Sequence, residues 1–132
     1  MIGDTLTVRQ ASSSPWATLP DQVSNSVSLA KVNQDNFGAE YRFIGTAGRY
    51  IARVRNSIEP ATANRALTHR HNVELNYLVP GATSADPEVL YQTYVIGRFP
   101  PVGSMDLKEA IWYAATTALT EAQFAKVINM ES

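Results

Sequence analysis

The chain has 132 residues, of which 45% are hydrophobic and 17% charged, and its formal net charge is −1. This composition excludes an intrinsically disordered chain and predicts one folded domain with a moderate core. The absence of cysteine excludes disulfides and cysteine metal sites. No apolar run approaches the roughly 18 residues that span a bilayer, and residues 1–20 lack a signal peptide, so we expect a soluble, cytosolic protein with no membrane partner.

The beginning of the chain predicts a β-hairpin within residues 1–35. Two segments alternate apolar with polar side chains, as half-buried strands do. The segment between them is rich in serine and proline, which is typical of a loop, and Trp16 and Leu19 are its candidate anchors. A turn-forming stretch (NQDNFG) follows. The predicted strands are residues 4–10 and 27–32, the loop is 11–26 and the turn is 33–38.

An antiparallel sheet is predicted next, over residues 39–99. Its strands alternate strongly and are separated by segments that contain glycine or proline. The last of these segments (PGATSADP) predicts an exposed loop. The predicted strands are residues 39–44, 49–58, 67–79 and 88–99, with connections at 61–66 and 80–87.

Arginines are concentrated in these strands. From residue 42 to residue 70 there are six arginines and one acidic residue, Glu59, a local charge of +5 in a chain of net charge −1. Because successive side chains of a strand point to opposite faces, Arg49, Arg53 and Arg55 share one face of their strand. The pattern predicts a sheet with one basic face, which is typical of a surface that binds a polyanion.

The end of the chain, residues 104–132, predicts helices. Ser104 is a candidate N-cap, with Asp106 in the first turn, where the helix dipole favours an anion. An apolar stripe at helical spacing follows, formed by Leu107, Ala110, Ile111, Ala114, Ala118 and Leu119. Residues 120–123 (TEAQ) resemble a capping box and predict a second helix near Glu121 that buries Phe124, Val127 and Ile128. One continuous helix is the alternative.

The predicted elements also indicate a dimer. One helical tail of under 30 residues must cover the apolar face of a sheet with three long strands and a shorter one. A long strand at the edge of such a sheet favours pairing with another strand. Two subunits that align edge to edge, each laying its helices over the partner's strands, satisfy both requirements and make the basic face continuous.

His69 and His71 form a second pattern of side chains that could carry chemistry, and Asp86 and Glu88, most simply solvated, are a third that could hold a cation at a subunit contact. His-x-His on a strand places both imidazoles on one face, a spacing that metal sites use. The chain offers no further histidine and no cysteine, and Glu74 is predicted on the opposite face. Packing or a hydrogen bond under the helices is the favoured interpretation. No catalytic constellation or phosphate-binding glycine loop is visible.

Several motifs, taken together in order and spacing, resemble the coat proteins of single-stranded RNA bacteriophages (leviviruses). The similarity extends over nearly the whole chain and lies in the collinear set rather than in any one motif. The motifs are residues 3–7 (GDTLT), 32–35 (VNQD), 40–41 (EY), 52–55 (ARVR), 70–74 (RHNVE), 86–89 (DPEV) and 92–94 (QTY).

This resemblance implies a single α+β coat-protein domain over residues 1–132, with an N-terminal hairpin, an antiparallel sheet and two C-terminal helices packed on the sheet of a dimer partner. It implies a non-enzymatic protein with no cofactor and no small-molecule substrate. Dimers would assemble in the cytoplasm of the bacterial host into an icosahedral T=3 capsid around genomic RNA. In this family such dimers also bind an RNA hairpin of the viral genome, and this binding represses translation of the replicase. The loop 80–87 would surround the symmetry axes of the capsid.

The resemblance also implies the residues that contact RNA. Tyr94 matches a tyrosine on which a base stacks, whereas Ile51 and Ile96 lie where other members have polar base contacts. The implied RNA-binding residues are Arg49, Arg53, Arg55, Arg70, Asn72, Tyr94 and Arg98. Two other classes of function remain open: a cellular dimeric nucleic-acid-binding module, and a small metal-dependent enzyme built on His69 and His71.

Overall fold

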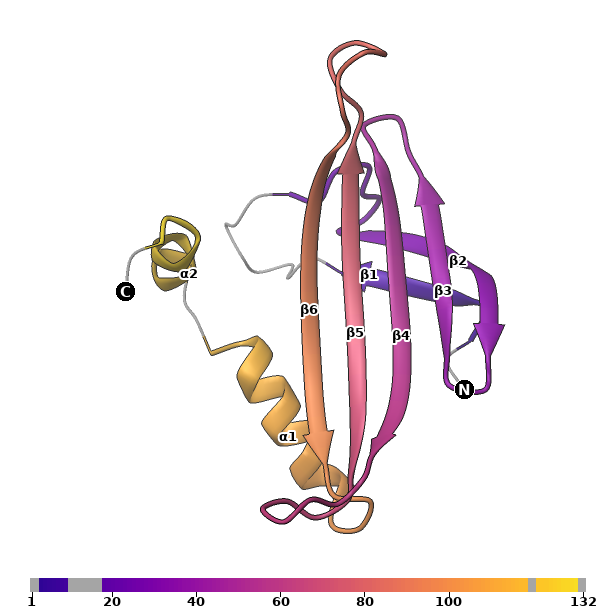
Figure 1. The fold of residues 1–132 in the computed structure, drawn as a ribbon. Helices are drawn as coiled ribbons and strands as arrows, with labels where there is room; N and C mark the ends of the chain where they lie inside the picture. The colour runs from indigo at the N-terminus through magenta and orange to yellow at the C-terminus, as the bar shows by residue number, and fades with distance from the viewer. Residues whose placement is uncertain (1–2, 10–17, 119–120, 131–132) are drawn as a thin grey trace.

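The computed structural model describes residues 3–9, 18–118 and 121–130. Its six strands form one antiparallel sheet in sequence order, followed by two helices (Figure 1). The strands are β1 (Thr5–Arg9), β2 (Ser26–Asp35), β3 (Gly38–Ile44), β4 (Arg49–Glu59), β5 (Thr68–Val79) and β6 (Val89–Phe99), and the helices are α1 (Met105–Thr116) and α2 (Glu121–Ile128). The α+β class, the hairpin and the two C-terminal helices agree with the prediction. The predicted anchor Trp16 lies outside the described residues.

β2 is longer than the alternation of its residues predicts. It continues to Asp35, past an irregularity between Lys31 and Asn33, and its last residues pair with the start of β3. The predicted turn over residues 33–38 is therefore too long. Its polar sequence resembles a loop, but an extra residue at a bulge lets the strand continue, and backbone pairing with β3 decides the outcome. Asp35 Oδ1 closes the shortened turn by accepting a hydrogen bond from the backbone N of Phe37 at 2.8 Å.

The sheet curls so that its N-terminal hairpin covers the apolar face of the central strands. Figure 1 shows β1 and the start of β2 running across the direction of β4, β5 and β6. Two buried tyrosines from β3 and β4 attach to the N-terminal part of the chain. The Tyr41 hydroxyl donates to the carbonyl of Gly3 at 3.0 Å, and the Tyr50 hydroxyl donates to that of Pro20 at 2.7 Å. The core consists of Val27, Leu29, Tyr41, Tyr50 and Ala52.

The connection into β2 is fixed to the β3–β4 turn by one carboxylate. Asp21 accepts hydrogen bonds from the backbone N and the hydroxyl of Thr46, at 3.1 and 2.8 Å, and from the backbone N of Ala47 at 3.1 Å. These bonds, that of the Thr46 hydroxyl first, hold the pKa of the Asp21 carboxyl below its usual value. The hairpin is thus held on the core face from both of its ends.

The helices begin and end close to the predicted positions. Ser104 is the N-cap of α1, and its hydroxyl accepts a hydrogen bond from the backbone N of Leu107 at 3.3 Å. α1 ends at Thr116, and α2 begins at Glu121, so the alternative of one continuous helix is wrong. The remainder of the predicted capping box starts at Thr120, which lies outside the described residues, as does Leu119. No helix in the described ranges is long and apolar enough to cross a membrane.

The apolar side chains of the helices, which are predicted to be covered by the sheet of a dimer partner, are exposed in the single chain. α1 contacts β6 through Trp112, whose ring centre lies 5.9 Å from that of Phe99, while α2 lies beyond β6 and away from the sheet (Figure 1). Five of the predicted buried residues are exposed: Leu107, Ile111, Phe124, Val127 and Ile128.

Candidate nucleic-acid interface

The strand register places all seven predicted RNA-binding residues on one face of β4, β5 and β6, which we call the arginine face. Arg55 lies opposite Asn72 of β5, and Arg70 lies opposite Arg98 of β6. Arg53 and Tyr94 lie on either side of Glu74 in one row across the three strands. The remaining residue, Arg49, lies two positions before Ile51 on the same face of β4. This face is opposite the one that the hairpin and α1 cover.

Carboxylates from neighbouring strands and loops also lie on this face. The charge of +5 was counted over residues 42–70, and most of these carboxylates lie outside that range. Glu40 of β3 accepts from Arg42 Nη2 at 2.6 Å and from Arg53 Nε at 2.8 Å. Arg53 Nη1 also reaches Glu74 Oε1 at 3.1 Å. Side chains directly opposite each other on paired strands are only about 5 Å apart, however distant they are in the sequence. The arginine face is consequently a network of ion pairs rather than a purely basic surface.

Arg53 is the most firmly held arginine of this network. The hydrogen bond from Arg53 holds the pKa of the Glu40 carboxyl below its usual value, and Glu40 in turn raises the pKa of Arg53. On the other side, Glu74 accepts from Asn76 Nδ2 at 2.6 Å and from Gln92 Nε2 at 3.2 Å as well as from Arg53. These carboxylates take two of the five N–H donors of the Arg53 guanidinium, so Arg53 organises the network and keeps donors for a ligand.

Arg49 and Arg55 make weaker contacts at the rim. Arg49 Nη2 lies 2.9 Å from Glu88 Oε2, and Arg55 Nη2 lies 3.2 Å from Asp35 Oδ2. About half of each of these four side chains is exposed. Exposed pairs of this kind contribute about 0–1 kcal/mol, so a phosphate can replace the carboxylate at little cost.

A different arrangement surrounds Glu59, the last residue of β4. Arg98 Nε donates to both of its carboxylate oxygens, at 3.1 and 2.9 Å, and Arg65 Nη2 lies 2.8 Å from Oε2. Arg70 Nε lies farther away, 3.7 Å from Oε1. We call these four residues the Glu59 cluster. The hydrogen bond from Arg98, and after it the charges of the arginines, hold the pKa of the Glu59 carboxyl below its usual value.

The other two predicted residues, Tyr94 and Asn72, differ in how far their side chains are buried. Tyr94 is 52% exposed, so its ring is open to stacking. The side-chain oxygen of Asn72 is buried without a hydrogen-bond partner. Sequence reasoning did not single out Asn76, although it is the one buried polar residue of the described core, at 4% exposure. Its position on the polar face of an alternating strand gave no signal for this burial.

On the opposite face, His69 and His71 lie under α1. Their ring centres are 6.5 Å apart, and His71 Nδ1 lies 2.7 Å from Asn56 Oδ1. Together with Trp112 and Lys108 they line a hollow of about 570 Å³. Burial, and after it the neighbouring His69 and Lys108, lowers the pKa of His71. This is the hydrogen-bonded histidine under the helices that the sequence favours.

Nothing in the described ranges supports the metal-dependent enzyme. No three histidine, cysteine, aspartate or glutamate side chains come together there in a way that could hold a metal ion. Glu74 lies on the arginine face, away from both histidines, as predicted.

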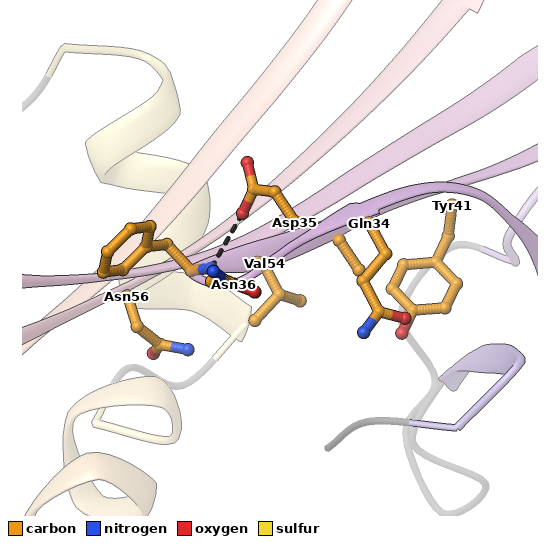
Figure 2. A pocket seen from close by; sticks show the side chains of 9 residues that line it. Gln34, Asp35, Asn36, Tyr41, Val54 and Asn56 are labelled. Atoms are coloured by element: carbon orange, nitrogen blue, oxygen red, sulfur yellow. Dashed lines mark hydrogen bonds between the residues drawn. The ribbon is translucent and has the colours of Figure 1, made fainter.

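A smaller hollow of about 280 Å³ lies beside the β2–β3 turn (Figure 2). Asp35 and Asn56, two of its polar side chains, already have partners within the chain. Asp35 accepts from the backbone N of Phe37, which is the dashed line of Figure 2, and pairs with Arg55. Asn56 contacts His71. The side chains that line this hollow therefore stabilise the turn, and we assign no ligand to it.

Comparison with known proteins agrees with the resemblance noted in the sequence. Residues 3–100, about three quarters of the chain, match the family model described as "Phage phiCb5, coat protein". The matched range contains β1 to β6 and ends before α1. A search of curated proteins found no match. The chain thus belongs to the phage phiCb5 coat protein family, and it is a structural, non-enzymatic subunit of a phage capsid.

Proposed function

We propose that this coat protein forms the shell of a single-stranded RNA phage, as dimers that assemble into an icosahedral T=3 capsid with the arginine face toward the packaged genome. The observation that carries the proposal is the separation of the two faces of the sheet. Seven arginines gather on or beside one face, while the hairpin and α1 occupy the other. A shell protein that encloses a polyanion needs this separation.

The exposed groups of the arginine face suit single-stranded RNA. A planar guanidinium can donate two hydrogen bonds to a phosphate, and Arg49 and Arg55 can exchange their exposed carboxylate partners for one. An unpaired base stacked on Tyr94 would contribute about 1–3 kcal/mol. By the same contacts, a dimer would bind an RNA hairpin of the genome and repress replicase translation.

Exposed apolar side chains support the dimer. β6 is an edge strand of eleven residues, and Val89, Leu90 and Tyr91 on it are exposed. Ile111 of α1 and Phe124 of α2 are exposed as well. A second subunit that pairs along β6 and lays its helices over this sheet would cover both sets and remove the open edge.

Electron microscopy of the protein expressed alone, with the absorbance ratio at 260 and 280 nm on the same fraction, tests this proposal. We expect uniform shells that contain nucleic acid. A discrete dimer without larger particles would contradict shell assembly by this subunit alone. Shells that are reproducibly free of nucleic acid would keep the capsid role and contradict RNA packaging by this subunit.

A paired substitution tests the RNA-binding face. Arg53→Ala with Arg55→Ala should reduce RNA uptake and the salt dependence of binding while the dimer persists, because both guanidinium groups lie on the arginine face. Unchanged RNA uptake in a folded variant would refute the assignment of this face.

A further inference from the structure

The positive charge of the arginine face is concentrated at one end. Among the described residues that form its ion pairs there are seven arginines and five carboxylates, an excess of two positive charges. Arg42 and Arg53 are balanced by Glu40 and Glu74, and the two rim pairs are balanced one to one. The entire excess lies in the Glu59 cluster, where one carboxylate faces three guanidinium groups.

The positive charge of this cluster is only partly balanced, since Glu59 is the one carboxylate paired with its three arginines. Arg70 and Arg98 are direct partners across β5 and β6, and like charges in that relation destabilise a sheet. Arg70 Nε is buried and has no hydrogen-bond partner, since Glu59 is too far away for one. A buried donor without a partner costs about 1–3 kcal/mol. A second anion beside the cluster would relieve the repulsion between Arg70 and Arg98.

The surroundings of the cluster leave room for such an anion. A hollow of about 560 Å³ adjoins the cluster at Arg70, and its lining includes Arg55, Ser57 and Asn72 and no carboxylate. Arg65 reaches the cluster from the β4–β5 connection. Its backbone is fixed by a hydrogen bond from Thr62 N to the carbonyl of Arg65 at 2.7 Å. The Arg65 and Arg98 guanidinium groups are oriented by their pairs with Glu59 before any ligand arrives.

We propose that the Glu59 cluster is a phosphate-binding site that takes one phosphate group of the RNA backbone. The assignment rests on the proposed RNA-packaging function and refines it. Glu59 holds Arg65 and Arg98 in orientation, and the phosphate accepts from their remaining donors and from Arg70. Because a phosphate carries no sequence information, this site contributes affinity and register without base preference.

Salt-dependent binding of a single-stranded oligoribonucleotide to the RNA-free subunit tests the site, with Arg65→Gln as the first variant. Arg65 is exposed and lies outside the strands, so the variant should fold, which circular dichroism checks. Loss of one phosphate contact should reduce the slope of log K against log salt by about 0.7, which is roughly a fivefold loss of affinity at 0.1 M salt. Arg98→Gln should behave alike, and Arg65→Lys should keep most of the slope.

Arg42→Gln is the matched control. Arg42 is an equally exposed arginine of the same face that pairs with a carboxylate, but its pair belongs to the balanced part of the network. It should leave the slope unchanged. If the wild-type protein binds RNA and Arg65→Gln has the wild-type slope, the phosphate site is wrong and the proposed function stands.

A titration with inorganic phosphate, followed by NMR of the arginine Nε–H signals, separates the two sources of the ligand. Shifts at Arg65, Arg70 and Arg98 but not at Arg42 are expected alongside RNA binding. The same shifts in a protein that binds no RNA would assign the site to free phosphate, and would overturn both the RNA contact and the packaging function. If neither RNA nor phosphate binds, both proposals fail.

Discussion

Replacing Gly97 by alanine should loosen α1 from the sheet. Gly97 lies on the covered face of β6, and an added Cβ would overlap the six-membered part of the Trp112 ring. It would also approach Phe99 Cε2 to 2.6 Å. Trp112 and Phe99 form the ring contact that joins α1 to β6, so the indole must move and the helix with it.

The expected change in the free energy of unfolding follows from two opposing effects. Overpacking of a well-packed site costs typically about 1–3 kcal/mol. Removing a glycine from a strand returns about 0.5–1 kcal/mol, because alanine loses less conformational freedom on folding. Since a rigid indole cannot absorb an overlap as the end of a flexible chain could, overpacking prevails. We expect Gly97→Ala to lower the free energy of unfolding by about 1–2 kcal/mol.

Urea unfolding of the subunit, followed by tryptophan fluorescence in a Trp16→Phe background, measures the effect at Trp112 alone. A matched cycle uses Trp112→Ala, and its unfolding is followed by circular dichroism, because this variant has no tryptophan left in the Trp16→Phe background. Without the indole, Phe99 can move into the vacated space, and Gly97→Ala should then be neutral or slightly stabilising. An equal loss of stability with and without Trp112 would refute the packing argument, as would an unchanged Trp112 emission in Gly97→Ala.

Three further predictions concern the core, the histidines and the dimer. Leu29→Ala should cost about 2–5 kcal/mol of unfolding free energy, because the side chain is fully buried, and little change in urea unfolding would show that the site collapses or is not the core. The pKa of His71 is lowered in the folded protein, so the unfolded chain binds the proton at a higher pH than the folded chain does. The free energy of unfolding should therefore be greatest above pH 6.5 and fall as the pH drops below it. His71→Gln should flatten this dependence in thermal unfolding. Ile111→Asp should leave the monomer folded, since Ile111 is 57% exposed there. It should abolish the dimer and the shell, because the charge would be buried against the partner. A native dimer on gel filtration would show that the partner covers another face.

The sequence determined the elements of this fold because their signals are local. Alternation placed the strands within a few residues, and it put Arg53, Arg55 and Arg70 on a common face. Ser104 marked the start of α1, since an N-cap depends only on the next turn of the chain. The separation into a polar and an apolar face of the sheet was therefore readable without coordinates, and the coat-protein fold was implied by the resemblance of the motifs.

The partners of those side chains were decided only by the tertiary structure. Glu40 lies 13 residues before Arg53, and Glu59 lies 39 residues before Arg98, yet both pairs are in hydrogen-bond contact. A strand's own periodicity gives its faces but not the register with its neighbours, so the sequence showed a basic segment where the folded sheet has ion pairs. The way α1 meets the chain's own sheet was also decided by the tertiary structure, since the contact of Trp112 with Phe99 leaves Ile111 exposed.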